Sequence, residues 1–215
     1  MFLIAIIIKI VYNNSIFMGG KFMKKNNVKT LSFMAMFSAL CFVGTFIHIP
    51  INVGSSTTMI HLGNIFLLVG SLYLGGIKGG LSAAVGMTIF DLTNGYATYA
   101  PSTFILKFLM AFVCGSVYTN LKDKNMNKNL VLLIALTCGG LTNIILDPIV
   151  TAYMRKWIFG LNQGGTNLII LYESFATVIN AVIAISFSFV IYKTLEKANL
   201  TNKFVNTKIK ETKTV

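Results

Sequence analysis

The sequence has few charged residues. Only 11% of its 215 residues are Asp, Glu, Lys or Arg, whereas 55% are hydrophobic. Soluble globular domains carry about 25% charged residues, so this composition argues against a water-soluble domain. A helix needs roughly 20 apolar residues to cross the hydrocarbon core of a bilayer, and this chain has room for about six such helices. The composition therefore predicts one integral membrane domain.

Motifs of nucleotide and peptide hydrolysis are also absent. The sequence contains no P-loop pattern GxxxxGK[ST], no HExxH and no GxSxG. No acidic or metal-ligating pair has a spacing suited to catalysis on lipid. Cys41, Cys114 and Cys138 lie in apolar runs without CxxC or Cys/His spacing, which is typical of buried reduced thiols. We expect neither an enzyme nor a metal site, so any transport must draw energy from an ion gradient or a partner protein.

Positive charges outnumber negative ones, with 18 Lys and Arg against 6 Asp and Glu. Such an excess can indicate nucleic-acid binding, but these charges fall in the tails and between apolar runs rather than on one amphipathic face. We therefore expect no nucleic-acid partner. In a membrane protein this distribution reports orientation instead.

Six apolar segments follow one another, at about 30–49, 63–76, 79–95, 103–120, 130–153 and 168–192. We expect each to form a membrane-spanning helix, so the predicted fold class is an all-α integral membrane protein with six transmembrane helices. The stretch "GGIKGG", residues 75–80, separates the second and third segments. It predicts a tight hairpin, because glycines permit both the turn and close contact between helices.

The lysines predict the orientation of these helices. With six helices, the lysines before the first helix, in every second loop and after the last helix lie on one side of the membrane. They are Lys24, Lys25, Lys29, Lys78, Lys122, Lys124, Lys128, Lys193 and Lys197. The opposite loops carry only Arg155 and Lys156. The positive-inside rule then places both termini in the cytoplasm. The expected location of the chain is the cell membrane, as a multi-pass protein of a prokaryotic plasma membrane.

The first 22 residues are predicted to be separate from the membrane domain. Their run "MFLIAIIIKI" is too short to span, and it lacks the basic region and the cleavage site of a signal peptide. Gly19, Gly20 and Lys21 can be encoded by a purine-rich ribosome-binding sequence just before Met23. We interpret residues 1–22 as an over-extended start or a disordered segment, 23–200 as the six-helix domain, and 201–215 as a basic cytoplasmic tail.

Four ionisable residues lie inside the predicted helices: Asp91, Lys107, Asp147 and Glu173. With the orientation above, each falls in the outer half of the membrane. Charges at such depths are costly and normally face a partner or a water-filled cavity. Four helices that carry them at one depth predict a polar pocket open to the outside.

Neighbouring polar and aromatic residues extend this set. The candidate substrate-binding residues are His61, Asn64, Asp91, Asn94, Tyr96, Tyr99, Lys107, Asn143, Asp147, Glu173 and Asn180. Asn94 and the two tyrosines follow Asp91 and offer amide and aromatic contacts to a planar polar ligand. Steps of four residues place Asn143, Asp147 and Thr151 on one helical face. The outer loops at 48–64 and 154–167 are expected to act as lids.

Each of these features also has a structural explanation. The charged groups can satisfy one another, for example Asp147 with Arg155 or Glu173 with Lys107, and Lys107 can instead extend its ammonium group to the membrane interface. The tyrosines can belong to an aromatic belt at the membrane surface. The two histidines have no acidic or cysteine partner at metal spacing, which favours loop hydrogen bonding over a metal site.

The first predicted helix carries Ala35 and Ala39 in an AxxxA pattern. Small residues four positions apart leave a shallow groove where another helix can approach closely. The pattern is a candidate docking face for a partner, and packing within the chain explains it equally well.

These features resemble the S components, the substrate-capture subunits, of energy-coupling factor (ECF) vitamin transporters of the riboflavin type. The resemblance covers nearly everything after Met23 and is carried by the AxxxA pattern, by "LYLGGIKGGLSAAVG" and by "DLTNGYATYAPSTFILKFLMAFVCG". It implies a six-helix subunit that binds a vitamin or precursor from the outside and has no cofactor. It also implies as partners a transmembrane scaffold (T) subunit, which Ala35 and Ala39 would contact, and two ATP-binding-cassette ATPases that use the ATP.

The resemblance leaves the substrate open, because this fold accommodates several vitamins by changing pocket side chains. Asp91 and Asn94 favour a small ring compound such as pyridoxine or hydroxymethylpyrimidine, whereas Trp157 and the two tyrosines can stack on riboflavin. The alternative function is a stand-alone secondary permease for a small polar metabolite, in which Asp91, Asp147 and Glu173 relay protons. Against it, no charged residue continues the path to the cytoplasm.

Overall fold

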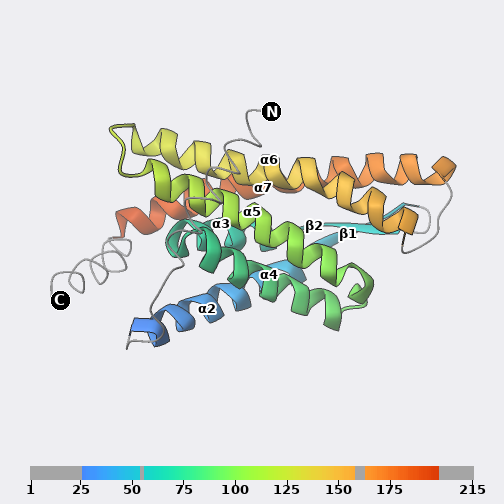
Figure 1. Cartoon of the computed structure of the whole chain (residues 1–215), viewed down its shortest axis with the longest axis horizontal. Coiled ribbons are helices and arrows are strands. Elements are labelled where there is room, and N and C mark those ends of the chain that lie inside the picture. Colours follow the sequence, from blue (N-terminus) through green and yellow to red (C-terminus); the bar gives the residue numbers. More distant parts are fainter. Residues whose placement is uncertain (1–25, 54–55, 158–162, 199–215) are drawn as a thin grey trace.

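The structure is a computed structural model that describes residues 26–53, 56–157 and 163–198. These residues form six α-helices, one short 3-10 helix and one two-stranded sheet (Figure 1). The elements are α2 (Asn26–Phe46), β1 (His48–Val53), β2 (Ser56–His61), α3 (Gly63–Leu74), α4 (Gly76–Thr93), η1 (Ala97–Tyr99), α5 (Ala100–Leu121), α6 (Lys128–Trp157) and α7 (Gln163–Lys197). The predicted N-terminal segment 1–22 and the tail 201–215 lie outside the described residues.

The helices have the length and surface of a membrane protein. Among the described residues, four stretches are long and apolar enough to cross a bilayer: Val28–Phe46, Ala97–Leu121, Lys128–Met154 and Ile170–Lys197. Large apolar side chains such as Val43, Ile149 and Phe187 are more than half exposed, which suits contact with lipid. The prediction of an all-α membrane fold with six helices is therefore confirmed, but only four of the six described helices are long and apolar enough to cross a bilayer.

The helix α3 is shorter than a membrane span. Its 12 residues rise about 18 Å, whereas the hydrocarbon core is roughly 30 Å thick. The segment before it, expected to be a lid loop, instead forms an antiparallel hairpin in which His48 pairs with His61 and Ile51 with Thr58. Figure 1 shows this hairpin in the part of the bundle that α3 does not reach. The second expected lid is 154–167. Its described parts, 154–157 and 163–167, are helical and belong to α6 and α7, whereas 158–162 lie outside the described residues.

Glycines bring α3, α4 and α5 into backbone contact. Gly75, with a φ of 80°, forms the one-residue turn between α3 and α4, which is the predicted tight hairpin. A Cβ atom on Gly115 of α5 would lie 2.6 Å from the carbonyl oxygen of Ser71 and 2.7 Å from the nitrogen of Gly76. Since those are backbone atoms, they have no rotamer by which to move aside. We call this contact between the three helices the glycine seam.

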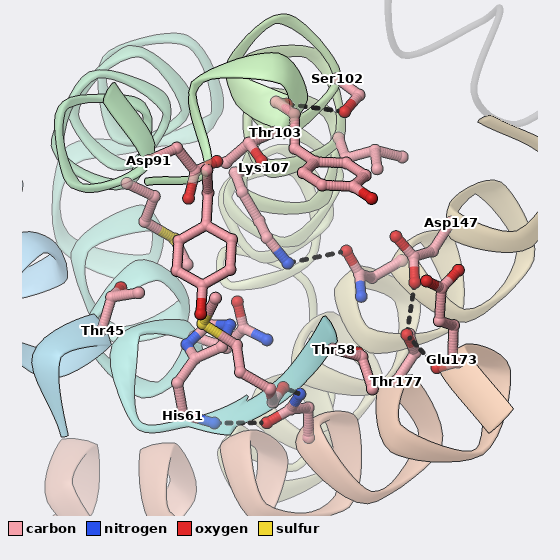
Figure 2. A pocket seen from close by; sticks show the side chains of 18 of the residues that line it. Thr45, Thr58, His61, Asp91, Ser102, Thr103, Lys107, Asp147, Glu173 and Thr177 are labelled. Carbon is pink, nitrogen blue, oxygen red and sulfur yellow. Dashed lines mark hydrogen bonds between the residues drawn. The ribbon is translucent and has the colours of Figure 1, made fainter. Parts of the chain in front are cut away.

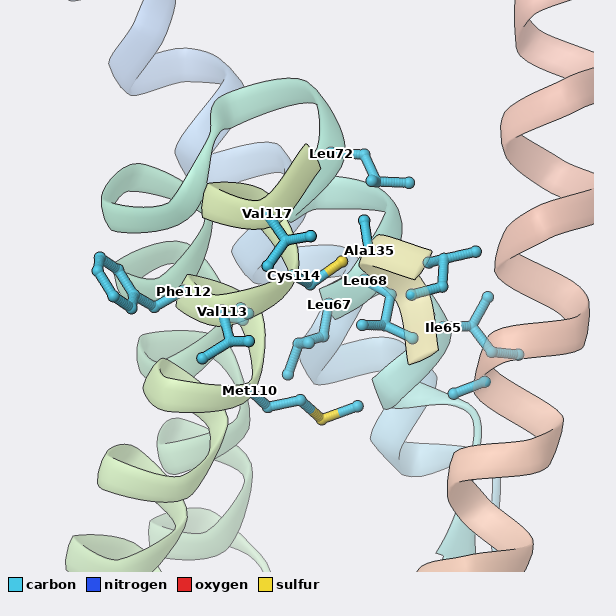
Figure 3. Close-up of a cluster of buried hydrophobic side chains, with 14 of the residues drawn as sticks. Ile65, Leu67, Leu68, Leu72, Met110, Phe112, Val113, Cys114, Val117 and Ala135 are labelled. Carbon is cyan, nitrogen blue, oxygen red and sulfur yellow. The ribbon is translucent and has the colours of Figure 1, made fainter. Parts of the chain in front are cut away.

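The apolar core occupies the half of the bundle that contains α3 (Figure 3). Many of its most deeply buried side chains come from α3, α5 and α6: Leu67, Leu68, Met110, Cys114, Leu132 and Leu136. At the same end the hydroxyl groups of Tyr118 and Tyr192 form a 2.5 Å hydrogen bond between α5 and α7. This half of the bundle is therefore filled by side chains.

The helix α2 begins and α7 ends at the same end of the bundle, on the left in Figure 1. The turn between α3 and α4 and the loop between α5 and α6 lie there too. The lysines at this end, which we call the lysine end, are Lys29, Lys78, Lys122, Lys124, Lys128, Lys193 and Lys197.

Replacing Gly115 by alanine should lower the free energy of unfolding by about 1–3 kcal/mol, the range for an overpacked interior. The new methyl group would press on the backbone of the turn between α3 and α4. The matched control is Gly140→Ala, whose Cβ meets only flexible side-chain atoms within 3.5 Å, the nearest being Ile185 Cδ1 at 2.8 Å. Thermal unfolding in detergent measures both variants, and equal melting temperatures would contradict the glycine seam.

Candidate binding cavity

A cavity lies in the half of the bundle beyond the N-terminal end of α3. Its volume is about 150 Å³, which holds several water molecules or part of a small ring compound. All six helices, β2 and the segment around η1 contribute side chains (Figure 2). The lining residues are Thr45, Thr58, Met59, His61, Asn64, Met87, Asp91, Tyr96, Tyr99, Ser102, Thr103, Leu106, Lys107, Asn143, Asp147, Thr151, Glu173, Thr177 and Asn180.

The structure brings ten of the eleven candidate residues to this cavity: His61, Asn64, Asp91, Tyr96, Tyr99, Lys107, Asn143, Asp147, Glu173 and Asn180. The exception is Asn94. Its Nδ2 donates to the carbonyl oxygen of Phe90 at 2.9 Å and to Thr93 Oγ1 at 2.8 Å. An asparagine at a helix end commonly bonds the local backbone in this way. Asn94 therefore closes the C-terminal end of α4 instead of lining the cavity.

Most of the hydroxyl groups that line the cavity were not among the predicted binding residues. Ser and Thr are poor indicators of a site because they often bond the backbone of their own helix, as Thr45 Oγ1 does with the Cys41 carbonyl oxygen at 2.7 Å. Helical spacing was the available signal. Thr103 lies four residues before Lys107 and Thr177 four residues after Glu173, so each faces the same way as its charged neighbour.

On the side of α5, α6 and α7, the polar side chains of the cavity bond to one another. Lys107 Nζ donates to Asn143 Oδ1 at 3.2 Å, so the ammonium group points into the cavity (Figure 2). The Thr177 hydroxyl bonds the carboxylate of Asp147 and lies 3.0 Å from the Glu173 carbonyl oxygen. The arrangement fixes these side chains before any ligand enters. The proposed partner of Asp147, Arg155, has a side chain outside the described part of the structure.

The amide of Asn180 joins the hairpin to α7. Its Oδ1 accepts a hydrogen bond from the backbone nitrogen of His61, and its Nδ2 donates to the carbonyl oxygen of Met59, both at 2.9 Å. These two backbone groups lie on the edge of β2 that faces away from β1. Asn180 therefore pairs the strand edge as a further strand would, and it holds the hairpin against the cavity.

On the side of β2, α3 and α4, several polar atoms have no hydrogen-bond partner among the described residues. They are His61 Nδ1, both amide atoms of Asn64, and Asp91 Oδ2. The side chain of Asn64 is only 1% exposed. Burial of polar atoms without partners costs free energy. This wall, which faces Asp147 and Thr177 across the cavity in Figure 2, thus has unused hydrogen-bonding capacity.

The imidazole of His61 lies at the end of β2 and lines the cavity, where its Nδ1 is buried without a hydrogen-bond partner among the described residues. A neutral imidazole carries one donor and one acceptor nitrogen. Nδ1 can therefore bond a ligand without adding charge to the cavity.

The model of one protein family, described as "ECF-type riboflavin transporter, S component", matches residues 25–197. The matched range contains all six helices and every residue that lines the cavity. No curated protein matches the chain significantly.

Proposed function

The chain belongs to the family of S components of ECF-type riboflavin transporters, and from this we propose that its cavity captures a vitamin or vitamin precursor outside the cell. The chain is a multi-pass protein of the cell membrane and a transport subunit, not an enzyme. S components bind substrate without a cofactor, and the ATP is hydrolysed by partner ATPases. The proposed partners of this chain are a T subunit and two such ATPases, with which it delivers its cargo inward.

The observation that carries the proposal is the separation of the bundle into two halves. Ten candidate residues and several hydroxyl groups line a cavity in one half, and an apolar core fills the other. A cavity that is closed at one end by a packed core suits capture of a ligand from one side of the membrane. Release on the other side then requires a larger movement of the subunit. A proton-driven permease needs polar groups that continue across the membrane, and the core residues occupy that path.

The proposed orientation rests on the lysine end. Seven described lysines lie there, together with the start of α2 and the end of α7. The positive-inside rule favours the cytoplasm for such an end. The termini are then cytoplasmic and the cavity faces the outside, where a vitamin is captured.

The proposed cargo is a polar heterocyclic ring. Tyr96 and Tyr99 offer aromatic faces, Lys107 offers a donor, and Asp91 and Asp147 offer acceptors. Riboflavin is the vitamin that the family description names. Pyridoxine and hydroxymethylpyrimidine are the single-ring compounds with matching polar groups.

The proposed docking face for the T subunit contains Ala35 and Ala39. Both are exposed, whereas Phe37 and Cys41 of the same helix are buried in the bundle. The AxxxA pattern therefore contributes little to packing within the chain, which was its alternative explanation. An exposed groove of small residues is suited to close contact with a partner helix.

The protein purified in detergent should release a stoichiometric amount of a vitamin, identified by mass spectrometry of the denatured sample. Asp91→Ala should remove the bound vitamin, because a buried carboxylate of the cavity is lost. Asp123→Ala is the matched control, since Asp123 is exposed in the loop after α5. Empty wild-type protein that also fails to bind riboflavin, pyridoxine and hydroxymethylpyrimidine would contradict vitamin capture.

The double variant Ala35→Leu, Ala39→Leu should keep vitamin binding and lose uptake in cells that contain the T subunit and the ATPases. The bulkier side chains fill the groove. Ser186→Leu is the control, because Ser186 is an exposed small residue on α7. Loss of binding in the double variant would assign the alanines to folding instead. Proton-driven uptake by vesicles with this chain alone would favour the permease.

A further inference from the structure

The helix α3 begins inside the bundle, next to the cavity. Its C-terminal end is at the lysine end, because a Cβ on Gly75 would lie 3.8 Å from Thr119, near the last turn of α5. Since α3 rises only about 18 Å from there, its first residue lies within the membrane thickness. Asn64, the second residue of the helix, lines the cavity.

This helix end is buried and has no side-chain cap. Leu62 occupies the N-cap position, and no side-chain hydrogen bond caps the first turn. Gly63, Asn64 and Ile65 are all buried. The first turn of a helix presents backbone N–H groups without intrahelical partners, together with a partial positive charge. Two N–H groups at this end have backbone acceptors, because that of Leu62 donates to the carbonyl oxygens of Gly44 and Ile47 and that of Ile65 to the carbonyl oxygen of Leu62. Burial of the next two, those of Gly63 and Asn64, is unfavourable unless another group supplies the acceptor.

Unpartnered side-chain atoms surround the same helix end. The amide of Asn64 has neither its donor nor its acceptor satisfied in the described residues, and Nδ1 of His61 is in the same situation. Both side chains are more than nine-tenths buried. A Cβ on Gly63 would lie 3.1 Å from His61 Nδ1, so the imidazole stands directly beside the start of the helix.

We propose that the N-terminal end of α3, with Asn64, forms the subsite that binds one edge of the cargo ring. This inference rests on the proposed function and specifies the chemistry of its cargo. The positive helix end favours an acceptor oxygen or nitrogen on that edge. The Asn64 amide pairs with an acceptor that stands beside a donor, as asparagine does with the edge of adenine.

The charges of the cavity indicate a neutral edge. The lining residues include three acidic side chains and one lysine: Asp91, Asp147, Glu173 and Lys107. A phosphate or carboxylate on the cargo would meet these acidic side chains. The subsite therefore selects an uncharged ring edge with an acceptor next to a donor. The imide edge of riboflavin and the aminopyrimidine edge of hydroxymethylpyrimidine have this pattern, and the ring nitrogen of pyridoxine has no such donor beside it.

The test compares Asn64→Leu and Asn64→Asp with the wild type. Leucine removes both polar atoms, and aspartate replaces the donor by a second acceptor. The dissociation constants of riboflavin, hydroxymethylpyrimidine and pyridoxine are measured for each protein, together with the melting temperature without ligand. The matched controls are Asn129→Leu and Asn129→Asp, because Asn129 is likewise the second residue of its helix, α6, and is exposed outside the cavity.

Both Asn64 variants should bind riboflavin or hydroxymethylpyrimidine about ten- to a hundred-fold more weakly, the loss expected for a buried polar edge left without its partner. The empty Asn64→Leu protein should melt no lower than the wild type, because the amide has no bond to lose. The Asn129 variants should keep the wild-type affinity.

Unchanged affinity in Asn64→Leu would overturn the subsite and leave vitamin capture standing. A lower melting temperature of the empty Asn64→Leu protein would also overturn it, since the amide would then have a structural partner. Wild-type protein that binds pyridoxine alone would refute the proposed ring edge but not the capture of a vitamin. Failure to bind all three compounds, with no retained cargo, would overturn both proposals.

Discussion

The hydrogen bonds of Asn180 to the edge of β2 are the interaction on which the cavity depends. A strand inside a membrane bundle presents backbone groups that lipid cannot satisfy, which is why isolated strands are not found there. Asn180 satisfies two of them, on His61 and Met59. Without it, the hairpin would expose unpaired backbone groups to α7, and one wall of the cavity would lose its support. A single amide thus allows a hairpin to occupy a place where a helix would otherwise continue.

The hairpin and the short helix α3 are two consequences of the same arrangement. Because the hairpin occupies part of the crossing, α3 starts within the bundle, and its uncapped end meets the cavity. The two walls of the cavity differ as a result. Around Asp147 and Lys107 the side chains bond to each other and are held in position. Around Asn64 the side-chain atoms have no such partners among the described residues. Under the proposed function, support and ligand recognition are therefore carried by different sets of residues.

The helices and the convergence of polar residues were accessible from the sequence, because long apolar segments and the depth of each charge determine both. The hairpin was not, since the amide that pairs its outer strand edge belongs to Asn180, which lies 119 positions from His61 in the chain. Asn94, in contrast, was predicted to bind the substrate but does not line the cavity. It is close to Asp91 in sequence, but its amide is used by the backbone of α4. Local spacing can place a residue on a helix face, whereas the use of an amide depends on partners that only the folded chain brings together.

The glycine seam has a mechanical consequence. Side chains that separate two helices can change rotamer and let the helices slide, but backbone in contact with backbone leaves no such freedom. We therefore expect α3, α4 and α5 to move as one block. The start of α3 and Asp91 belong to these helices, so we expect their relative positions to persist when the subunit moves. Under the proposed function, cargo release then requires displacement of the hairpin, α6 or α7 against the block, or reorientation of the whole subunit with this part of the cavity intact.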